Sequence, residues 1–399
     1  GWRPCPERRA DLAPGTTLMK TPVIAIFLAL IFLLLAACTP GTARPESGWA
    51  GPVLSENLVY VSSQDGRVVA LNAQSCTPVF GSFPQEQDDP LMGIYGTPSL
   101  EAMTLFVGSY GDNKVKSKLY ALNASDLNSD PFWTYPGPGD DETDIRQVVA
   151  GSVVADGKVI FGSSDGYMYA INIATGQLAW SPFKTNDKIW STPTVDSDTV
   201  YFGSLDHGLY AISVADGSPR WPSPFQADGS IVSSPLVVGG RVYFGSFDRN
   251  FYAVDTRSGT QVWSFQGDAW FWSSPVVDIE RRAIYIGDMN GMLHALDIDT
   301  GVKQWEFDLE NPIISTPVMI DGLLVVASDG GLVYVISPAA SIQQPPFIDV
   351  KAKVRAPLET KDGIVYIHAL DRKVTALRVG RTIQDKLWEY DTETGECSR

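Results

Sequence analysis

The chain has 399 residues, of which 44% are hydrophobic and 19% are charged, so it has enough apolar side chains to form a core and is not intrinsically disordered. Its formal net charge of −16 disfavours binding to nucleic acid or to anionic lipid headgroups, because both repel an acidic surface. The 36 glycines and 27 prolines indicate frequent turns, which favours many short strands.

The N-terminal segment has the pattern of a secretory signal. Lys20 precedes the apolar run TPVIAIFLALIFLLLAAC, which ends at Cys38 and has small residues just before that cysteine. A retained transmembrane anchor is the alternative, although a spanning helix needs about 20 apolar residues. We take Met19 as the expected start and predict three parts: residues 1–37 as upstream segment and signal peptide, 38–48 as lipidated N-terminus and linker, and 49–399 as the folded domain.

The end of the apolar run, Leu35-Ala36-Ala37-Cys38, resembles the lipobox of bacterial lipoproteins. That resemblance implies that Cys38 carries a diacylglycerol, and a multiply acylated terminus anchors stably to a membrane. Thr39 is not aspartate, which implies the inner leaflet of the outer membrane in a cell with two membranes. In a cell with one membrane, the same anchor would place the protein on the outer surface.

The rest of the chain repeats one pattern. FGSSDGYMYAINIATGQLAW at residues 161–180 recurs as FGSLDHGLYAISVADGSPRW, FGSFDRNFYAVDTRSGTQVW and IGDMNGMLHALDIDTGVKQW, the last ending at Trp305. A proline recurs just before the first strand of almost every unit, with Ser152 in its place once. These prolines are Pro52, Pro98, Pro193, Pro235, Pro275, Pro317 and Pro357. Self-similarity with a period of about 40 residues indicates eight units between Gly51 and the C-terminus.

Each unit predicts four short strands. In the third unit these are SVVA, KVIFGS, YMYAINI and QLAW, and they are separated by turns at 156–157, 164–166 and 175–176. Apolar residues alternate or run together for only four to seven positions, which is too short for helices. Four-stranded units of this length are propeller blades. The fold class predicted is therefore all-β, an eight-bladed β-propeller.

The units resemble the pyrroloquinoline-quinone-type (PQQ-like) repeat, in which a tryptophan closes the fourth strand. The matching residues are Trp133, Trp180, Trp221, Trp263, Trp305 and Trp388. The resemblance implies that these tryptophans are structural and dock between blades. A lipobox followed by eight such blades resembles the BamB family of outer-membrane assembly lipoproteins. It implies a non-catalytic scaffold bound to the membrane by its lipid, with a β-barrel assembly protein as the partner and no nucleic acid.

A quinoprotein oxidoreductase that uses PQQ or another small ligand is the alternative, and a cell-surface interaction propeller is a second one. The chain lacks the adjacent cysteine pair common in quinoprotein dehydrogenases and any Cys-x-x-Cys-His for haem. His207, His294 and His368 fall in different slots of different blades, which predicts no metal site. We therefore expect no catalytic residues, no metal and no cofactor.

The loops between blades and the turns between second and third strands should share one face of the propeller. There, the loops at 81–95 and 134–149 are long and acidic, and aromatic residues precede several of the proline positions. Such aromatics favour a binding surface, although they could simply pack on each other and the acidic run could be solvated. The candidate binding surface consists of Tyr95, Trp190, Trp270, Phe271, Trp272, Asp140, Asp141, Glu142 and Asp144.

Two cysteines remain in the folded domain. Cys76 replaces the turn glycine of the first unit, and Cys397 lies beyond the last strand of the eighth. The expected strand directions place them on opposite faces, so the sequence disfavours a disulfide between them unless the C-terminal tail folds back.

Overall fold

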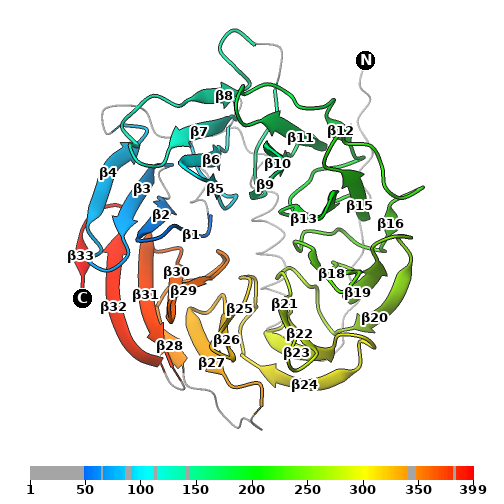
Figure 1. The fold of residues 1–399 in the computed structure, drawn as a ribbon. Coiled ribbons are helices and arrows are strands. Elements are labelled where there is room, and N and C mark those ends of the chain that lie inside the picture. The colour runs from blue at the N-terminus through cyan, green and yellow to red at the C-terminus, as the bar shows by residue number, and fades with distance from the viewer. Residues whose placement is uncertain are drawn as a thin grey trace, which may run out of the picture. The chain divides into compact units, whose positions relative to one another are not determined.

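Eight antiparallel sheets stand side by side in a ring in the computed structural model (Figure 1). The structure describes residues 49–63, 66–85, 91–111, 115–140, 144–339, 347–380 and 383–399, within a compact unit Glu46–Arg399. The predicted signal peptide, the lipid site at Cys38 and the linker 38–48 lie outside these ranges. None of the described residues belongs to a helix that is long and apolar enough to cross a membrane. The prediction of an all-β, eight-bladed propeller is confirmed.

Blades 1 to 4 contain four strands each, which we call A to D from the centre of the ring outwards. The strands of blades 1 and 2 are β1 (Val53–Leu54), β2 (Leu58–Ser62), β3 (Val68–Asn72), β4 (Pro78–Phe83), β5 (Ser99–Glu101), β6 (Thr104–Gly108), β7 (Leu119–Asn123) and β8 (Trp133–Tyr135). Those of blades 3 and 4 are β9 (Ser152–Ala155), β10 (Lys158–Gly162), β11 (Tyr167–Asn172), β12 (Phe183–Lys184), β13 (Thr194–Asp196), β14 (Thr199–Gly203), β15 (Gly208–Ser213) and β16 (Phe225–Gln226).

Blades 5 to 7 repeat this plan, and blade 8 adds a fifth strand. The strands of blades 5 and 6 are β17 (Leu236–Val238), β18 (Arg241–Gly245), β19 (Asn250–Asp255), β20 (Gln261–Gln266), β21 (Val276–Asp278), β22 (Ala283–Gly287), β23 (Met292–Asp297) and β24 (Lys303–Asp308). Those of blades 7 and 8 are β25 (Val318–Ile320), β26 (Leu323–Ala327), β27 (Leu332–Ile336), β28 (Phe347–Asp349), β29 (Glu359–Lys361), β30 (Ile364–His368), β31 (Lys373–Val379), β32 (Ile383–Asp391) and β33 (Cys397–Ser398).

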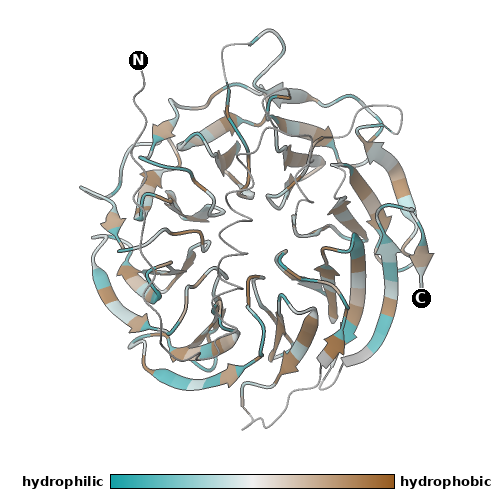
Figure 2. Ribbon diagram, turned by 180° about the vertical axis from the view of Figure 1, so that it is seen from behind, coloured by the Kyte–Doolittle hydropathy of each residue, from teal (hydrophilic) through white to brown (hydrophobic). Residues whose placement is uncertain are grey.

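Strands B and C form the core of each blade. In β10 every residue after Lys158 is buried, whereas in the outermost strand β24 exposed and half-buried residues alternate. Figure 2 shows the same difference, with mainly hydrophobic strands inside and alternating hydropathy along the outer strands. Strands B and C are covered on both faces by neighbouring blades, so they read as continuous apolar runs, while strand D has one face in water.

Serine and threonine side chains link the innermost strands of neighbouring blades. The backbone N–H of Thr192 donates to Ser234 Oγ at 3.0 Å, and the N–H of Ser234 donates to Ser274 Oγ at 2.9 Å. Gly151 donates to Thr192 Oγ1 in the same way, at 2.9 Å. These hydroxyls sit just before the recurrent proline, so that motif satisfies backbone N–H groups that the inner edge of each sheet would leave unpaired.

Tryptophans at or just before the outer strand of several blades contact the C–D turn of the next blade. The indole N–H of Trp221 donates to the carbonyl of Thr256 at 2.9 Å, in the C–D turn of the next blade. In that turn Gly259 has φ +69°, and a Cβ placed there would lie 2.7 Å from the Trp221 ring. Glycine therefore serves both the backbone conformation and the close approach of the indole.

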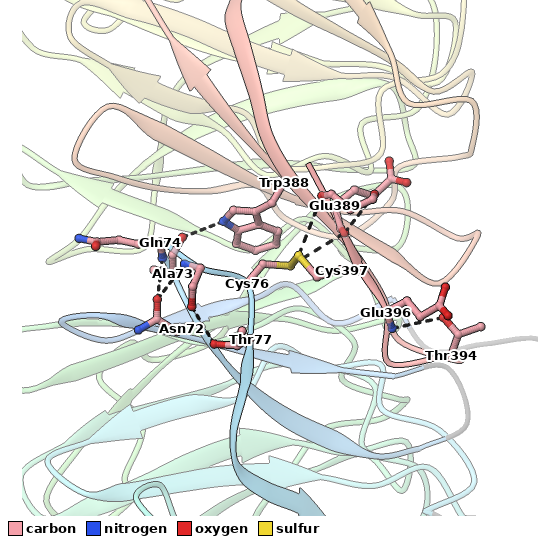
Figure 3. Close-up of a disulfide and its surroundings, with 12 residues drawn as sticks. Asn72, Ala73, Gln74, Cys76, Thr77, Trp388, Glu389, Thr394, Glu396 and Cys397 are labelled. Atoms are coloured by element: carbon pink, nitrogen blue, oxygen red, sulfur yellow. Dashed lines mark hydrogen bonds between the residues drawn. A yellow bond between two sulfur atoms is a disulfide. The ribbon is translucent and has the colours of Figure 1, made fainter.

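The C-terminal tail corrects the prediction about the cysteines, because Cys76 and Cys397 form a disulfide with a Cα–Cα distance of 6.1 Å (Figure 3). Asp391 Oδ1 accepts hydrogen bonds from the backbone N–H groups of Glu393 and Thr394, and the resulting turn reverses the chain. Strand β33 then runs back along β32, which places Cys397 opposite Tyr390. The prediction failed because it took the tail to end on the face where β32 ends.

Candidate functional site

The candidate site lies on the face that carries the B–C turns and the loops between blades, which we call the top face. Each loop is held to the B–C turn of the following blade by a backbone hydrogen bond. Leu205 N donates to Lys188 O, Phe247 N to Ser230 O and Met289 N to Trp270 O, each at 2.9 Å. The same backbone contact recurs from blade to blade, so the described parts of these loops are held at equivalent positions on this face.

One apolar side chain of each loop is inserted into the blade core. Ile189, Ile231, Phe271 and Ile313 occupy this position, and all are fully buried. The backbone N–H of Ile189 donates to Ser163 O at 3.0 Å, and Ile231 makes the equivalent bond to Ser204 O at 3.1 Å. In an extended segment successive side chains point to opposite sides. Most residues that follow an inserted side chain are therefore turned away from the core, whereas Tyr95 and Val232 are buried.

The repeat places these next residues at equivalent positions around the top face, and we call them the top-face ring. The ring consists of Trp49, Tyr95, Val149, Trp190, Val232, Trp272, Ile314 and Arg355. Seven of the eight side chains are apolar or aromatic, and most are half-buried. Arg355 is the polar exception, with its Nε 2.8 Å from Asp329 Oδ1.

Tyr95, a predicted site residue, lies in an aromatic group that includes Trp49 and Tyr110. Its ring centroid is 4.7 Å from the centroids of both partners. Tyr95 is 8% exposed, and burial raises the pKa of its hydroxyl to about 12. It therefore contributes packing between blades 1 and 2 more than accessible surface.

Trp190 is half-buried and already has partners within the chain. Its indole N–H donates to Ser164 Oγ at 3.1 Å, and the ammonium of Lys188 lies 5.5 Å from its ring centroid. A cation at that distance over an indole face is an attractive contact.

The three residues of the predicted aromatic run at 270–272 differ in their exposure. Trp270 is 45% exposed, Trp272 is half-buried, and Phe271 is fully buried against Phe251 and Phe265. Phe271 is therefore wrong as a surface residue, because it takes the inserted position of its loop. Neither Trp190 nor Tyr95 makes a ring contact with this run, so the predicted aromatics form separate groups.

The predicted acidic run is described only at its ends. Asp140 and Asp144 are exposed, while Asp141 and Glu142 lie outside the described residues. Asp144 Oδ1 accepts the backbone N–H of Arg146 at 3.1 Å, and the two side chains form an exposed ion pair at 3.6 Å. Such an exposed ion pair adds little stability.

Aspartates in the B–C turns pair with buried tyrosines, and this pairing has a structural role. Asp165 Oδ2 accepts the hydroxyl of Tyr169 at 2.7 Å, and Asp165 Oδ1 accepts the N–H of Tyr167 at 2.9 Å. Burial and the neighbouring carboxylate raise the pKa of Tyr169, which keeps the hydroxyl protonated as a donor. Blades 4 and 5 repeat this pair as Tyr210 with Asp206 and Tyr252 with Asp248. A device repeated in three blades is part of the architecture.

The histidine and acidic side chains described do not gather into a calcium centre. Over the described part of the chain, no three His, Cys, Asp or Glu side chains gather into a group that could hold a metal ion. His294 lies in blade 6 with its Nε2 3.1 Å from Asp288 Oδ2, and His368 lies in blade 8 with its Nδ1 2.9 Å from Ala50 O.

Sequence reasoning missed several residues of the top face, above all Trp49, Tyr110 and Phe247. Phe247 follows the glycine-serine pair that ends strand B, and Leu205 and Met289 hold the same place in blades 4 and 6. The available signal was that this turn position is apolar in blades 4 to 6, although it is polar in blades 3 and 7. It has meaning only once the turns are known to line the same face as the loops.

Comparisons with known proteins agree with this architecture. A search of curated proteins finds no match. Among solved structures, BamB from Moraxella catarrhalis matches with a TM-score of 0.66 and 19% sequence identity, covering 84% of this chain and 96% of that one. The computationally designed Ika8 protein matches with a TM-score of 0.67 and 15% identity, covering 84% of this chain and 97% of that one. At these identities the likeness shows the fold alone.

The family comparison goes further than the fold. The model described as outer membrane protein assembly factor BamB matches residues 37–221, 183–278 and 268–344. These matches cover more than half of the chain and include the regular blades 3 to 6. The chain belongs to the family of PQQ-like repeat propellers described as outer membrane protein assembly factor BamB.

Proposed function

We propose that this protein is a lipid-anchored, extracytoplasmic scaffold that binds a protein partner on its top face and takes part in outer-membrane protein assembly. The observation that carries the proposal is the top-face ring, in which apolar side chains stand at equivalent positions on loops fixed by backbone hydrogen bonds. Membership of the BamB family supports the same role.

The described part of the chain begins at the top face, which supports that face as the one that binds the partner. Trp49 contacts Tyr95 on the top face, and Ala50 is bonded to His368 at the end of strand B of blade 8. The segment 39–48, even if fully extended, spans no more than about 36 Å. A lipid on Cys38 would therefore keep the top face near the membrane, where a partner embedded in that membrane could reach it.

The proposal assigns no catalytic reaction to the protein, because a scaffold only has to hold its partner in place. A rigid ring suits this purpose, since a preformed surface loses little conformational entropy when it binds.

The test is crosslinking in intact membranes, with a photo-reactive residue placed at Trp190 or Trp270 and at Lys158 in the A–B turn region as a control. The proposal expects a β-barrel assembly protein to be recovered from the top-face positions and not from the control, and expects recovery to fall when Cys38→Ser releases the protein. Crosslinks that are equal from both faces would overturn it. So would sustained oxidation of alcohols or sugars by the purified protein with quinone and calcium.

A further inference from the structure

In residues 270–272 the side chains alternate between the surface and the core, and the buried central residue holds the segment in place. Phe271 is fully buried, its backbone N–H donates to Ser246 O at 3.2 Å, and a Cβ at Gly245 would lie 2.3 Å from Phe271 Cβ. Because the Phe271 side chain is buried next to the end of strand B, the indoles of Trp270 and Trp272 on either side of it are turned outwards. Two large aromatic side chains are thus held on the surface by a buried one.

Phe247 from the B–C turn of blade 5 packs against both indoles. Its ring centroid lies 5.1 Å from that of Trp270 with an interplanar angle of 16°, and 5.4 Å from that of Trp272 at 44°. We call Phe247, Trp270 and Trp272 the aromatic stack. The three rings are thus in contact with one another. The stack is therefore a platform whose outer ring faces are available, and Trp270, at 45% exposed, offers the largest one.

Trp190, in the loop between blades 3 and 4, is a useful contrast on the same face. Its ring carries the chain's own Lys188, and its indole N–H is bonded to Ser164. In the described part of the chain no lysine or arginine lies over the ring of Trp270 or Trp272. In the repeat Trp272 corresponds to Trp190, and Trp270 stands at the place of Lys188, so this loop carries a second indole where the earlier loop carries a cation.

The charges beside the aromatic stack would favour a cation. Asp268 lies two residues before Trp270, Asp248 follows Phe247, and Asp228 is joined to Asp248 through a backbone N–H to carboxylate bond of 2.9 Å. Asp228 and Asp268 are exposed, and none of the three forms an ion pair with another described residue. Arg249 stands in the same turn as a single positive charge among them. The surroundings are therefore net acidic, as is the whole chain.

We propose that the aromatic stack docks an extended, arginine-bearing segment of the partner protein. The guanidinium would stack on the open face of Trp270, because a planar, weakly hydrated cation pairs with an indole face better than an ammonium does. Asp228 and Asp268 would supply the long-range attraction. The inference rests on the proposed scaffold function and specifies the chemistry that this part of its surface recognises.

The test uses the full-length protein in detergent and the peptide acetyl-Thr-Arg-Leu-Arg-Thr-amide, with lysine, glutamine and glutamate versions as comparisons. Isothermal titration should rank arginine above lysine, with glutamine and glutamate weakest. Trp270→Ala should weaken binding of the arginine peptide about 2- to 5-fold, the effect of a cation–π contact at an exposed site. The double change Asp228→Asn and Asp268→Asn should weaken it at low salt and have little effect at high salt.

Phe132→Ala is the matched control, because Phe132 is an aromatic residue that is 58% exposed and lies outside the top-face ring and the aromatic stack, and it should leave peptide binding unchanged. Unaltered thermal unfolding of the Trp270 variant would show that the platform, and not the fold, is affected. Equal binding of the arginine and glutamine peptides would overturn the inference, as would a Trp270→Ala variant that binds like the wild type.

A membrane role for the aromatic stack is the competing outcome. If phosphatidylcholine vesicles shift the tryptophan fluorescence to the blue and Trp270→Ala abolishes the shift, the platform contacts lipid and the inference is wrong. The scaffold function would survive either failure, provided that the membrane crosslinks to the assembly protein persist. Loss of those crosslinks with peptide binding intact would overturn the function instead.

Discussion

The seam between blades 8 and 1 differs from a regular joint such as that between blades 4 and 5. The regular joint uses the indole bond of Trp221 to Thr256 and the serine and threonine bonds of the inner strands. The seam also uses an indole, from Trp388 to Ala73 O at 2.7 Å. It adds the disulfide, the bond from His368 to Ala50, and a lysine bridge from Lys361 Nζ to Ser55 O at 2.7 Å.

The difference follows from chain connectivity. Neighbouring blades elsewhere are consecutive in the chain and are joined by a single loop, so they are close in sequence before they pack. Blades 1 and 8 are built entirely from opposite ends of the chain, with no strand exchanged between their sheets. Their association must overcome the entropy of closing a very long loop. The additional links stand at the joint where the chain itself provides none.

The largest expected effect comes from removing the disulfide. Changing Cys76 and Cys397 together to serine should lower the free energy of unfolding by about 5 kcal/mol, because the crosslink closes a loop with a sequence separation of 321 residues. Urea unfolding with and without reductant measures this. Reductant should lower the midpoint of the wild type and leave the double variant unaffected. A reduced wild type with an unchanged midpoint would mean that the seam is already closed by its other contacts.

Removing an indole at each joint compares the two directly. Trp221→Ala and Trp388→Ala should each cost about 3–5 kcal/mol, since both side chains are buried and bonded to the next blade. Trp388 packs beside Cys76 in one hydrophobic cluster. Its loss should therefore be non-additive with loss of the disulfide, whereas the loss of Trp221 should be additive. Double-mutant cycles in urea decide this, and additivity at both joints would remove the distinction between them.

Two glycines with nearly the same positive φ differ in what surrounds them, so their replacement by alanine distinguishes the cost of backbone strain from the cost of a steric clash. Gly157 has φ +68° with open space around it, and Gly259 has φ +69° with the Trp221 ring 2.7 Å from a Cβ. Gly157→Ala should cost about 1–2 kcal/mol for the left-handed conformation alone. Gly259→Ala should cost more, because the added methyl group displaces the indole. Equal changes in thermal midpoint would show that the joint between blades 4 and 5 tolerates a shift of Trp221.

The smallest effect concerns pH at the seam. Burial lowers the pKa of His368 below its usual value, so the folded protein favours the neutral ring, which donates from Nδ1 to Ala50. The unfolded chain binds the proton more readily. This contribution to stability is therefore present above the ordinary histidine pKa of about 6.5 and is lost as the pH falls below it. Thermal unfolding between pH 7 and pH 5 should show it, and His368→Asn should flatten the dependence.

Sequence reasoning succeeded wherever a feature recurs. The blade number and the first three strands of blades 3 to 6 repeat at a readable period, and each repeat checks the others. The fourth strand of blade 3 was expected as QLAW at 177–180, but it is β12 at Phe183–Lys184. It did less well with residues whose surroundings are not repeated. Phe271 was expected on the surface together with its neighbours, because alternation within three aromatic residues does not show which of them points inwards.

The sequence by itself determined the eight blades and their turns, because these depend on local patterns that repeat from unit to unit. Only the tertiary structure decided that Cys397 meets Cys76 and that Phe247 joins Trp270 and Trp272. The cysteine pair depends on how a ring closes and on a tail that folds back. The aromatic stack depends on which turn and which loop share a face, and neither relation is a periodic property of the chain.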